Sequence, residues 1–159
     1  FLYPGGALMV LGVALGLAVL PAPLVLAEGF GLDVHSLLFA SAFVLLGFQG
    51  VAFAFCARVY ALQEGLLPRD PSLEALLSRF TLETGLVVGA SLVVLGFAGA
   101  VHTVLEWSGT GFGALDVSRT MRSAIPAVTA MCLGGQVMLT SFLLSFLGLR
   151  RRRSSGAPS

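Results

Sequence analysis

Two arginines that flank one linker are the residues best suited to binding chemistry. Arg58 lies near the end of a long apolar run, and Arg79 lies just before the next one. A guanidinium at headgroup depth can pair with a phosphate while its aliphatic stem stays in apolar surroundings. The pair therefore predicts a site for a lipid phosphate, and a simple excess of cations on one side of a membrane is the alternative explanation.

Polar side chains inside the apolar runs form a second candidate group. Gln49 and Gln136 lie deepest, and an amide in hydrocarbon is costly unless it is hydrogen-bonded. We interpret both as intramembrane packing residues that bond to neighbouring helices. His102 and Glu106 lie four residues apart beside Trp107, where anchoring at the membrane surface is favoured over a proton relay.

The sequence lacks the motifs that carry common catalytic chemistry. It contains no Asp-x-Asp element, no Walker loop, no zinc-ligand spacing and no nucleophile elbow. Cys56 and Cys132 both lie in apolar runs, and we interpret them as buried structural thiols. We therefore predict no catalytic residue, no metal ligand and no cofactor in this chain, and no nucleic-acid partner.

The composition places these residues in a membrane. Hydrophobic residues make up 57% and charged residues 11% of the 159 residues, and the mean hydropathy is +0.96. Four stretches are long and apolar enough to cross roughly 30 Å of hydrocarbon. They are about 3–20, 36–62, 82–107 and 120–149. The expected fold is all-α, an integral membrane four-helix bundle over residues 1–149 with the lipid bilayer as a partner, followed by a basic, disordered tail at 150–159.

Prolines divide the chain between these spans. Pro21 and Pro23 end the first span, although residues 24–27 could extend it beyond the break. In the linker between the second and third spans, Asp70 and Pro71 predict a helix start, and leucines then recur on one face. We expect a short interfacial helix there, lying on the bilayer.

The placement of arginines predicts the orientation. Most of the nine cationic residues lie in the linker between spans two and three, at its flanks, or in the C-terminal tail. These are Arg58, Arg69, Arg79 and Arg150 to Arg153. Only Arg119 and Arg122 lie in the linker between spans three and four. Because cytoplasmic loops carry the excess of basic residues, both termini are expected in the cytoplasm, which for a bacterial protein means a multi-pass protein of the inner membrane.

Glycines mark positions where helices can approach closely. Gly12 with Gly16, and Gly85 with Gly89, form two small-xxx-small pairs. The spans also contain Gly47, Gly50, Gly96, Gly99, Gly134 and Gly135. Packing within one chain is favoured over packing between copies in a homo-oligomer, and the spacing alone leaves both open.

Several short signatures resemble one known family. In the first half they are Phe1-Leu-Tyr-Pro-Gly, Gly31-Leu-Asp-Val-His-Ser-Leu-Leu, Leu46-Gly-Phe-Gln and Glu64-Gly-Leu-Leu-Pro. In the second half they are Gly111-Phe-Gly-Ala-Leu-Asp, Arg122-Ser-Ala-Ile-Pro-Ala and Ser141-Phe-Leu-Leu-Ser-Phe-Leu-Gly-Leu. Together they resemble the C-terminal membrane region of bacterial family-2 glycosyltransferases of the dolichyl-phosphate or polyprenyl-phosphate glucose or mannose synthase type.

The resemblance implies a supporting role for this chain. In such enzymes a cytoplasmic catalytic domain precedes the membrane region, uses a divalent metal (Mg or Mn), and moves a hexose from a nucleotide sugar to polyprenyl phosphate. The chain would then be the membrane anchor and the acceptor-lipid-presenting domain, with polyprenyl phosphate and the catalytic domain as partners. We expect the coding sequence upstream of Phe1 to encode that domain. The alternative, a stand-alone four-span flippase-like or scaffold protein for lipid-linked sugars, predicts a start codon close to Phe1.

Overall fold

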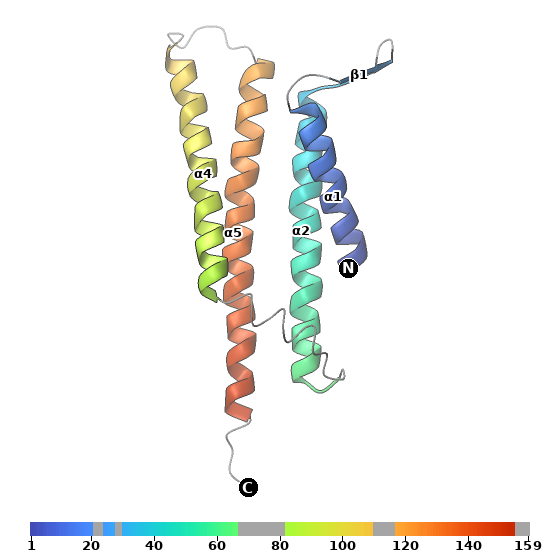
Figure 1. Ribbon diagram of the computed structural model, residues 1–159, viewed down its shortest axis with the longest axis vertical. Coiled ribbons are helices and arrows are strands. Elements are labelled where there is room, and N and C mark those ends of the chain that lie inside the picture. Colours follow the sequence, from blue (N-terminus) through green and yellow to red (C-terminus); the bar gives the residue numbers. More distant parts are fainter. Residues whose placement is uncertain (21–23, 28–29, 67–81, 110–116, 155–159) are drawn as a thin grey trace.

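Four long helices make up most of the computed structural model (Figure 1). The structure describes residues 1–20, 24–27, 30–66, 82–109 and 117–154. The helices are α1 (Leu2–Val19), α2 (Val34–Gln63), α4 (Leu82–Gly109) and α5 (Val117–Ser154), and two short strands, β1 (Leu24–Ala27) and β2 (Phe30–Leu32), lie between α1 and α2. The predicted all-α membrane bundle is confirmed, with one small strand pair added to it.

Each helix contains a segment that is long and apolar enough to cross a membrane. The segments are Leu2–Val19, Val34–Leu62, Leu82–Gly109 and Thr120–Leu147, and they agree closely with the predicted spans. Large apolar side chains are exposed along them, including Leu17 at 67% and Phe146 at 71%. Such a surface is expected where the surrounding solvent is lipid, because apolar side chains then have no water to avoid.

The helices alternate in direction and form two hairpins. α1 packs along α2, α4 packs along α5, and contacts between α2 and α5 join the two hairpins (Figure 1). The start of α1 and the end of α5 lie toward the same end of the bundle, which we call the terminal end. The other end, where β1 and β2 lie, we call the hairpin end.

Glycines allow the helices within each hairpin to approach closely. A Cβ atom on Gly12 would lie 2.7 Å from the carbonyl oxygen of Ala40 on α2. In the second hairpin, a Cβ atom on Gly134 would lie 2.5 Å from the carbonyl oxygen of Gly89. Any side chain would force these backbones apart, so the predicted packing of glycines within one chain is confirmed at these positions.

The other glycines singled out in the sequence fall into three groups, and at two of them, Gly50 and Gly99, an added Cβ atom would lie 3.3 and 3.2 Å from its nearest neighbour. A Cβ atom would also lie within 3.0 Å of the partner helix at Gly47, Gly85, Gly89 and Gly96. At Gly16, by contrast, a Cβ atom would meet only the Cβ of Ala40 at 3.8 Å, and at Gly135 it would meet nothing within 4 Å. These two positions have room for a side chain.

The segment after α1 is a strand and does not extend the helix. β1 pairs with β2 in an antiparallel arrangement, with Leu24 opposite Leu32. The expectation that residues 24–27 could lengthen the first span was wrong. Two prolines precede the segment and cannot continue the helical hydrogen bonds, and its Leu-Val-Leu sequence suits a strand.

A glycine ends α2 at the terminal end of the bundle. Gly65 has a φ of 71°, a left-handed conformation that costs glycine little. The N–H of Leu66 donates to the carbonyl of Ala61 at 3.0 Å, and the N–H of Gly65 donates to that of Leu62 at 3.3 Å. This pair of hydrogen bonds is typical of a helix C-terminus and satisfies the last carbonyls of the helix. The interfacial helix predicted from Asp70 and Pro71 lies outside the described residues.

α5 is longer than the sequence suggested. The fourth apolar segment ends near residue 149 as expected. We expected a disordered tail to follow it, but α5 continues to Ser154. Arginine has a high helix propensity, so the arginine run of residues 150–153 can extend the helix beyond the apolar segment. Residues 155–159 lie outside the described part of the chain.

Candidate functional site

Of the two predicted phosphate-binding arginines, Arg58 belongs to the terminal end of the bundle. Arg58 is exposed near the end of α2, about one turn before Gln63. At this depth a long cationic side chain can reach the headgroup layer. Arg79 lies outside the described residues. The predicted lipid-phosphate site therefore stays a prediction, supported by the position of Arg58.

The two intramembrane amides occupy different environments. Gln49 is exposed on α2, beside the exposed side chains of Leu46 and Phe53. Gln136 lies on α5, where its Oε1 atom is buried and accepts no hydrogen bond from the described residues. Among the residues that the structure describes, neither amide oxygen bonds to another helix.

A charged contact that the sequence analysis did not predict holds the hairpin end together. Nη2 of Arg122, on α5, lies 2.6 Å from Oδ1 of Asp33, which precedes α2. Nη1 of Arg122 also donates to the carbonyl oxygens of Val19 at 3.0 Å and Leu20 at 3.4 Å, at the end of α1. One side chain therefore joins three helices, and its cation faces the negative end of the α1 dipole. We call this contact the Arg122–Asp33 clasp.

The clasp stabilises the ionised form of the Asp33 carboxyl group. The hydrogen bond from the Arg122 guanidinium lowers the pKa of this carboxyl below its ordinary value, and the backbone N–H of Val34 acts in the same direction. The Asp33 side chain makes no capping bond to α2, whose first turn instead bonds to the backbone carbonyl of Asp33, with Ser36 N–H at 2.8 Å. The carboxylate is therefore available to bind α5.

Opposite charges at the starts of two spans that run in the same direction are the sequence signal that could have identified this pair. Arg122 was interpreted as a marker of orientation, and Arg122 and Asp33 each belong to a family signature, but the two residues were not paired. Arg122 lies just inside the fourth span and Asp33 just before the second. In an up-down bundle, those two positions fall at the same end.

Two further polar contacts lie at the hairpin end. The hydroxyl of Thr103 on α4 lies 3.1 Å from that of Ser123 on α5, which neighbours the clasp. On the outer face of α4, Nδ1 of His102 lies 4.0 Å from Oε2 of Glu106, with side chains 71% and 55% exposed. That exposure agrees with the predicted anchoring at the membrane surface and gives the pair no enclosed site.

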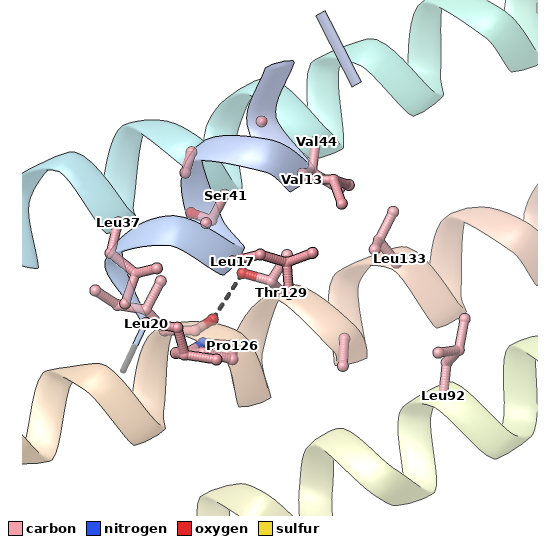
Figure 2. A pocket seen from close by; sticks show the side chains of 15 residues that line it. Val13, Leu17, Leu20, Leu37, Ser41, Val44, Leu92, Pro126, Thr129 and Leu133 are labelled. Atoms are coloured by element: carbon pink, nitrogen blue, oxygen red, sulfur yellow. Dashed lines mark hydrogen bonds between the residues drawn. The ribbon is translucent and has the colours of Figure 1, made fainter. Parts of the chain in front are cut away.

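An apolar groove of about 280 Å³ lies between the two hairpins (Figure 2). Leu17 of α1 and Leu37 and Val44 of α2 line one wall, and Pro126 and Leu133 of α5 line the other. Leu92 of α4 also contributes to the groove. We call this space the inter-hairpin groove.

The polar atoms that line the groove are already bonded. The hydroxyl of Ser41 donates to the carbonyl of Leu38 at 2.7 Å. That of Thr129 donates to the carbonyl of Ile125 at 2.6 Å (Figure 2). Both bonds are made within the helix that carries the hydroxyl. Neither hydroxyl therefore requires a polar ligand to accept its hydrogen bond. The surface of the groove favours an apolar occupant.

Among the described residues, no group of three or more His, Cys, Asp or Glu side chains could hold a metal ion. The described part of the chain thus contains three features of interest: the arginine-bearing terminal end, the inter-hairpin groove and the Arg122–Asp33 clasp. None of these three features, as far as their residues are described, pairs a nucleophile with a base.

Comparison with known proteins identifies the family. The profile of the glycosyltransferase family 2 C-terminal transmembrane region matches residues 55–148, more than half of the chain. The chain belongs to this family. No curated protein and no solved structure matches it. The predicted membrane region of a family 2 glycosyltransferase is therefore confirmed, and the chain is the membrane-anchoring part of such an enzyme.

The matched part of this glycosyltransferase membrane region covers some of the candidate residues. It contains Arg58, Arg122 and Gln136, together with all of α4. It excludes α1, β1, β2 and Asp33. The clasp and the groove thus each join matched segments to segments that lie before the match.

Proposed function

We propose that this chain presents a polyprenyl phosphate to the catalytic domain of its glycosyltransferase, which transfers a hexose to it from a nucleotide sugar. The observation that carries the proposal is the exposed position of Arg58 near the end of α2, within the segment that matches the family. The family match supports anchoring, and the arginine supports binding of the acceptor.

The chemistry of the acceptor suits the terminal end of the bundle. A polyprenyl phosphate carries an anionic headgroup at the membrane surface and a long hydrocarbon tail within the bilayer. The guanidinium fork of Arg58 can bind phosphate oxygens in pairs, and Arg79, across the linker in sequence, would supply a second cation. Holding the phosphate at a fixed place lowers the entropy cost of bringing acceptor and donor together.

The orientation follows from the same arginines. We place the terminal end in the cytoplasm of a bacterial inner membrane, because Arg58 of α2 and the arginine run of residues 150–153 of α5 belong to that end. Nucleotide sugars are charged and water-soluble, so the acceptor phosphate must be presented on the side that holds the donor. A divalent metal, Mg or Mn, would belong to the catalytic domain, and this chain would contribute position only.

Steady-state kinetics of the full-length glycosyltransferase test the proposal. Arg58→Ala combined with Arg79→Ala should raise the KM for polyprenyl phosphate by roughly tenfold, the loss of one or two charge-assisted hydrogen bonds, and leave the KM for the nucleotide sugar unchanged. Arg119→Ala, which removes a cation at the opposite end of the bundle, is the matched control and should change neither. An unchanged lipid KM in the double variant would overturn acceptor binding at these arginines.

The coding sequence provides a second test. An in-frame glycosyltransferase domain upstream of Phe1 would support the proposal. A stop codon followed by a start codon close to Phe1 would instead favour a stand-alone scaffold or flippase-like protein for lipid-linked sugars.

A further inference from the structure

The inter-hairpin groove has the properties of a hydrocarbon site. It encloses about 280 Å³, and Leu17, Leu37 and Leu133 are among the side chains that line it. At roughly 30 Å³ for a group of the size of water, this space holds about nine carbon-sized groups, or about two isoprene units. The hydroxyls of Ser41 and Thr129 donate to carbonyls of their own helices, so neither has a hydrogen left to donate to a polar ligand.

The depth of the groove distinguishes among lipid chains. Along α2, its near rim at Val44 lies about 21 Å from Arg58, and its far rim at Leu37 lies about 31 Å away, at about 1.5 Å per residue. One leaflet of hydrocarbon is only about 15 Å thick, half of the bilayer core. A lipid whose phosphate lies at Arg58 therefore reaches the groove only if its tail is longer than one leaflet.

We infer that the inter-hairpin groove receives the distal part of the acceptor's polyisoprenoid tail and thereby selects long-tailed acceptors. This inference rests on the proposed function, since it places the acceptor phosphate at Arg58. An ordinary acyl chain from the same leaflet is too short to fill the groove. The tail would follow the junction of α2 and α5, which joins the two hairpins.

Gly16 offers a way to fill the groove without disturbing the helices. It lines the groove, and a Cβ atom added to it would meet only the Cβ of Ala40 at 3.8 Å, an ordinary contact. Gly6 on the same helix has nothing within 4 Å of an added Cβ and does not line the groove. Gly16→Leu and Gly6→Leu are therefore the same chemical change on one helix, inside and outside the groove.

The test measures binding of two prenyl phosphates to the chain in nanodiscs by native mass spectrometry. The wild type should bind undecaprenyl phosphate more tightly than geranyl phosphate. Gly16→Leu should weaken binding of undecaprenyl phosphate at least about tenfold, or about 1.4 kcal/mol, and leave that of geranyl phosphate unchanged. Gly6→Leu should change neither. Ala130→Leu fills the groove from the α5 wall and should reproduce the effect, with Gly135→Leu as its control.

The other outcomes distinguish failure of the proposed function from failure of the groove inference alone. If the wild type binds neither prenyl phosphate, the proposed function fails and the inference fails with it. If both bind but Gly16→Leu and Ala130→Leu leave the long acceptor unaffected, the acceptor role stands and the groove inference is overturned. A phospholipid retained by the wild type and lost from both groove variants would then identify an acyl chain of the opposite leaflet as the occupant.

Discussion

Arg122 on α5 and Asp33 before α2 form an ion pair of 2.6 Å that joins the two hairpins at one end of the bundle. The same guanidinium bonds to the carbonyls of Val19 and Leu20 at the end of α1. The groove begins next to this contact, since Leu20 lines it. The clasp therefore fixes the distance between the walls of the groove at the hairpin end.

Removing Arg122 should destabilise the bundle more than neutralising Asp33. Asp33→Asn weakens the ion pair and keeps the bonds to α1, whereas Arg122→Ala removes both. The bonds from the guanidinium to the carbonyls add about 1.5 to 3 kcal/mol, the range for hydrogen bonds to a charged group. Thermal unfolding of the chain in detergent should show the lower Tm for Arg122→Ala.

A double-mutant cycle isolates the ion pair. The variant that combines Asp33→Asn with Arg122→Ala should be nearly as stable as Arg122→Ala alone, because Asp33 has already lost its partner in the single variant. Strictly additive effects would mean that the two side chains stabilise the bundle independently, contrary to the clasp.

Acid should open the clasp only at low pH. The pKa of Asp33 is lowered from its ordinary 3.8 because the carboxylate accepts a hydrogen bond from Arg122. A carboxyl whose folded pKa lies below the unfolded value contributes stability that is complete above the unfolded pKa and is lost as the pH falls through the folded one. The Tm difference between wild type and Asp33→Asn should thus stay constant from about pH 7 to pH 5 and shrink below about pH 4.

His35 is the control for this pH dependence, because its electrostatic interaction with Asp33 also lowers the pKa of that carboxyl. The same series in a His35→Gln background should show the same loss below about pH 4. A Tm difference that already changes between about pH 7 and pH 5 would assign the effect to another group.

Hydropathy was sufficient to predict the spans but not how they end. A run of about 20 apolar residues must become a helix in lipid, because backbone groups there can bond only internally. Outside the bilayer that constraint disappears. Residues 24–27 could therefore pair as strand β1, and α5 could continue to Ser154, although neither outcome follows from an apolar count.

The candidate site was only partly predictable for a related reason. Arg58 could be placed at a membrane surface from one span alone. The clasp and the groove depend on which faces of separate helices meet, and residues such as Gly12 and Gly16, although four apart, differ in whether a neighbour fills the space beside them. That difference comes from the packing of α1 on α2 and cannot be read from spacing.

Cysteine labelling should establish the orientation. In a chain with Cys56→Ala and Cys132→Ala, Leu66→Cys and Gly109→Cys place exposed thiols at opposite ends of the bundle. If the terminal end is cytoplasmic, a membrane-impermeant maleimide added to intact inner-membrane spheroplasts should label residue 109, and residue 66 only after permeabilisation. The reverse pattern would invert the topology and remove Arg58 from the side that holds nucleotide sugars.

Adjacent glycines on α5 should respond differently to the same substitution. A Cβ atom on Gly134 would lie 2.5 Å from the Gly89 carbonyl oxygen, so Gly134→Ala must push α4 and α5 apart. Overpacking of this kind costs about 1 to 3 kcal/mol. Gly135→Ala meets nothing within 4 Å and should be neutral, or stabilising by up to about 1 kcal/mol through helix propensity.

Reversible unfolding in mixed micelles would measure both free energies of unfolding. The comparison can be repeated on α1, where Gly12→Ala should destabilise and Gly16→Ala should not, since their added Cβ atoms would lie 2.7 Å from a backbone oxygen and 3.8 Å from a methyl group. Equal effects within either pair would show that the close approach of the helices does not determine the stability of the hairpins. A large effect confined to Gly12 and Gly134 would instead locate that stability at two backbone contacts, one in each hairpin.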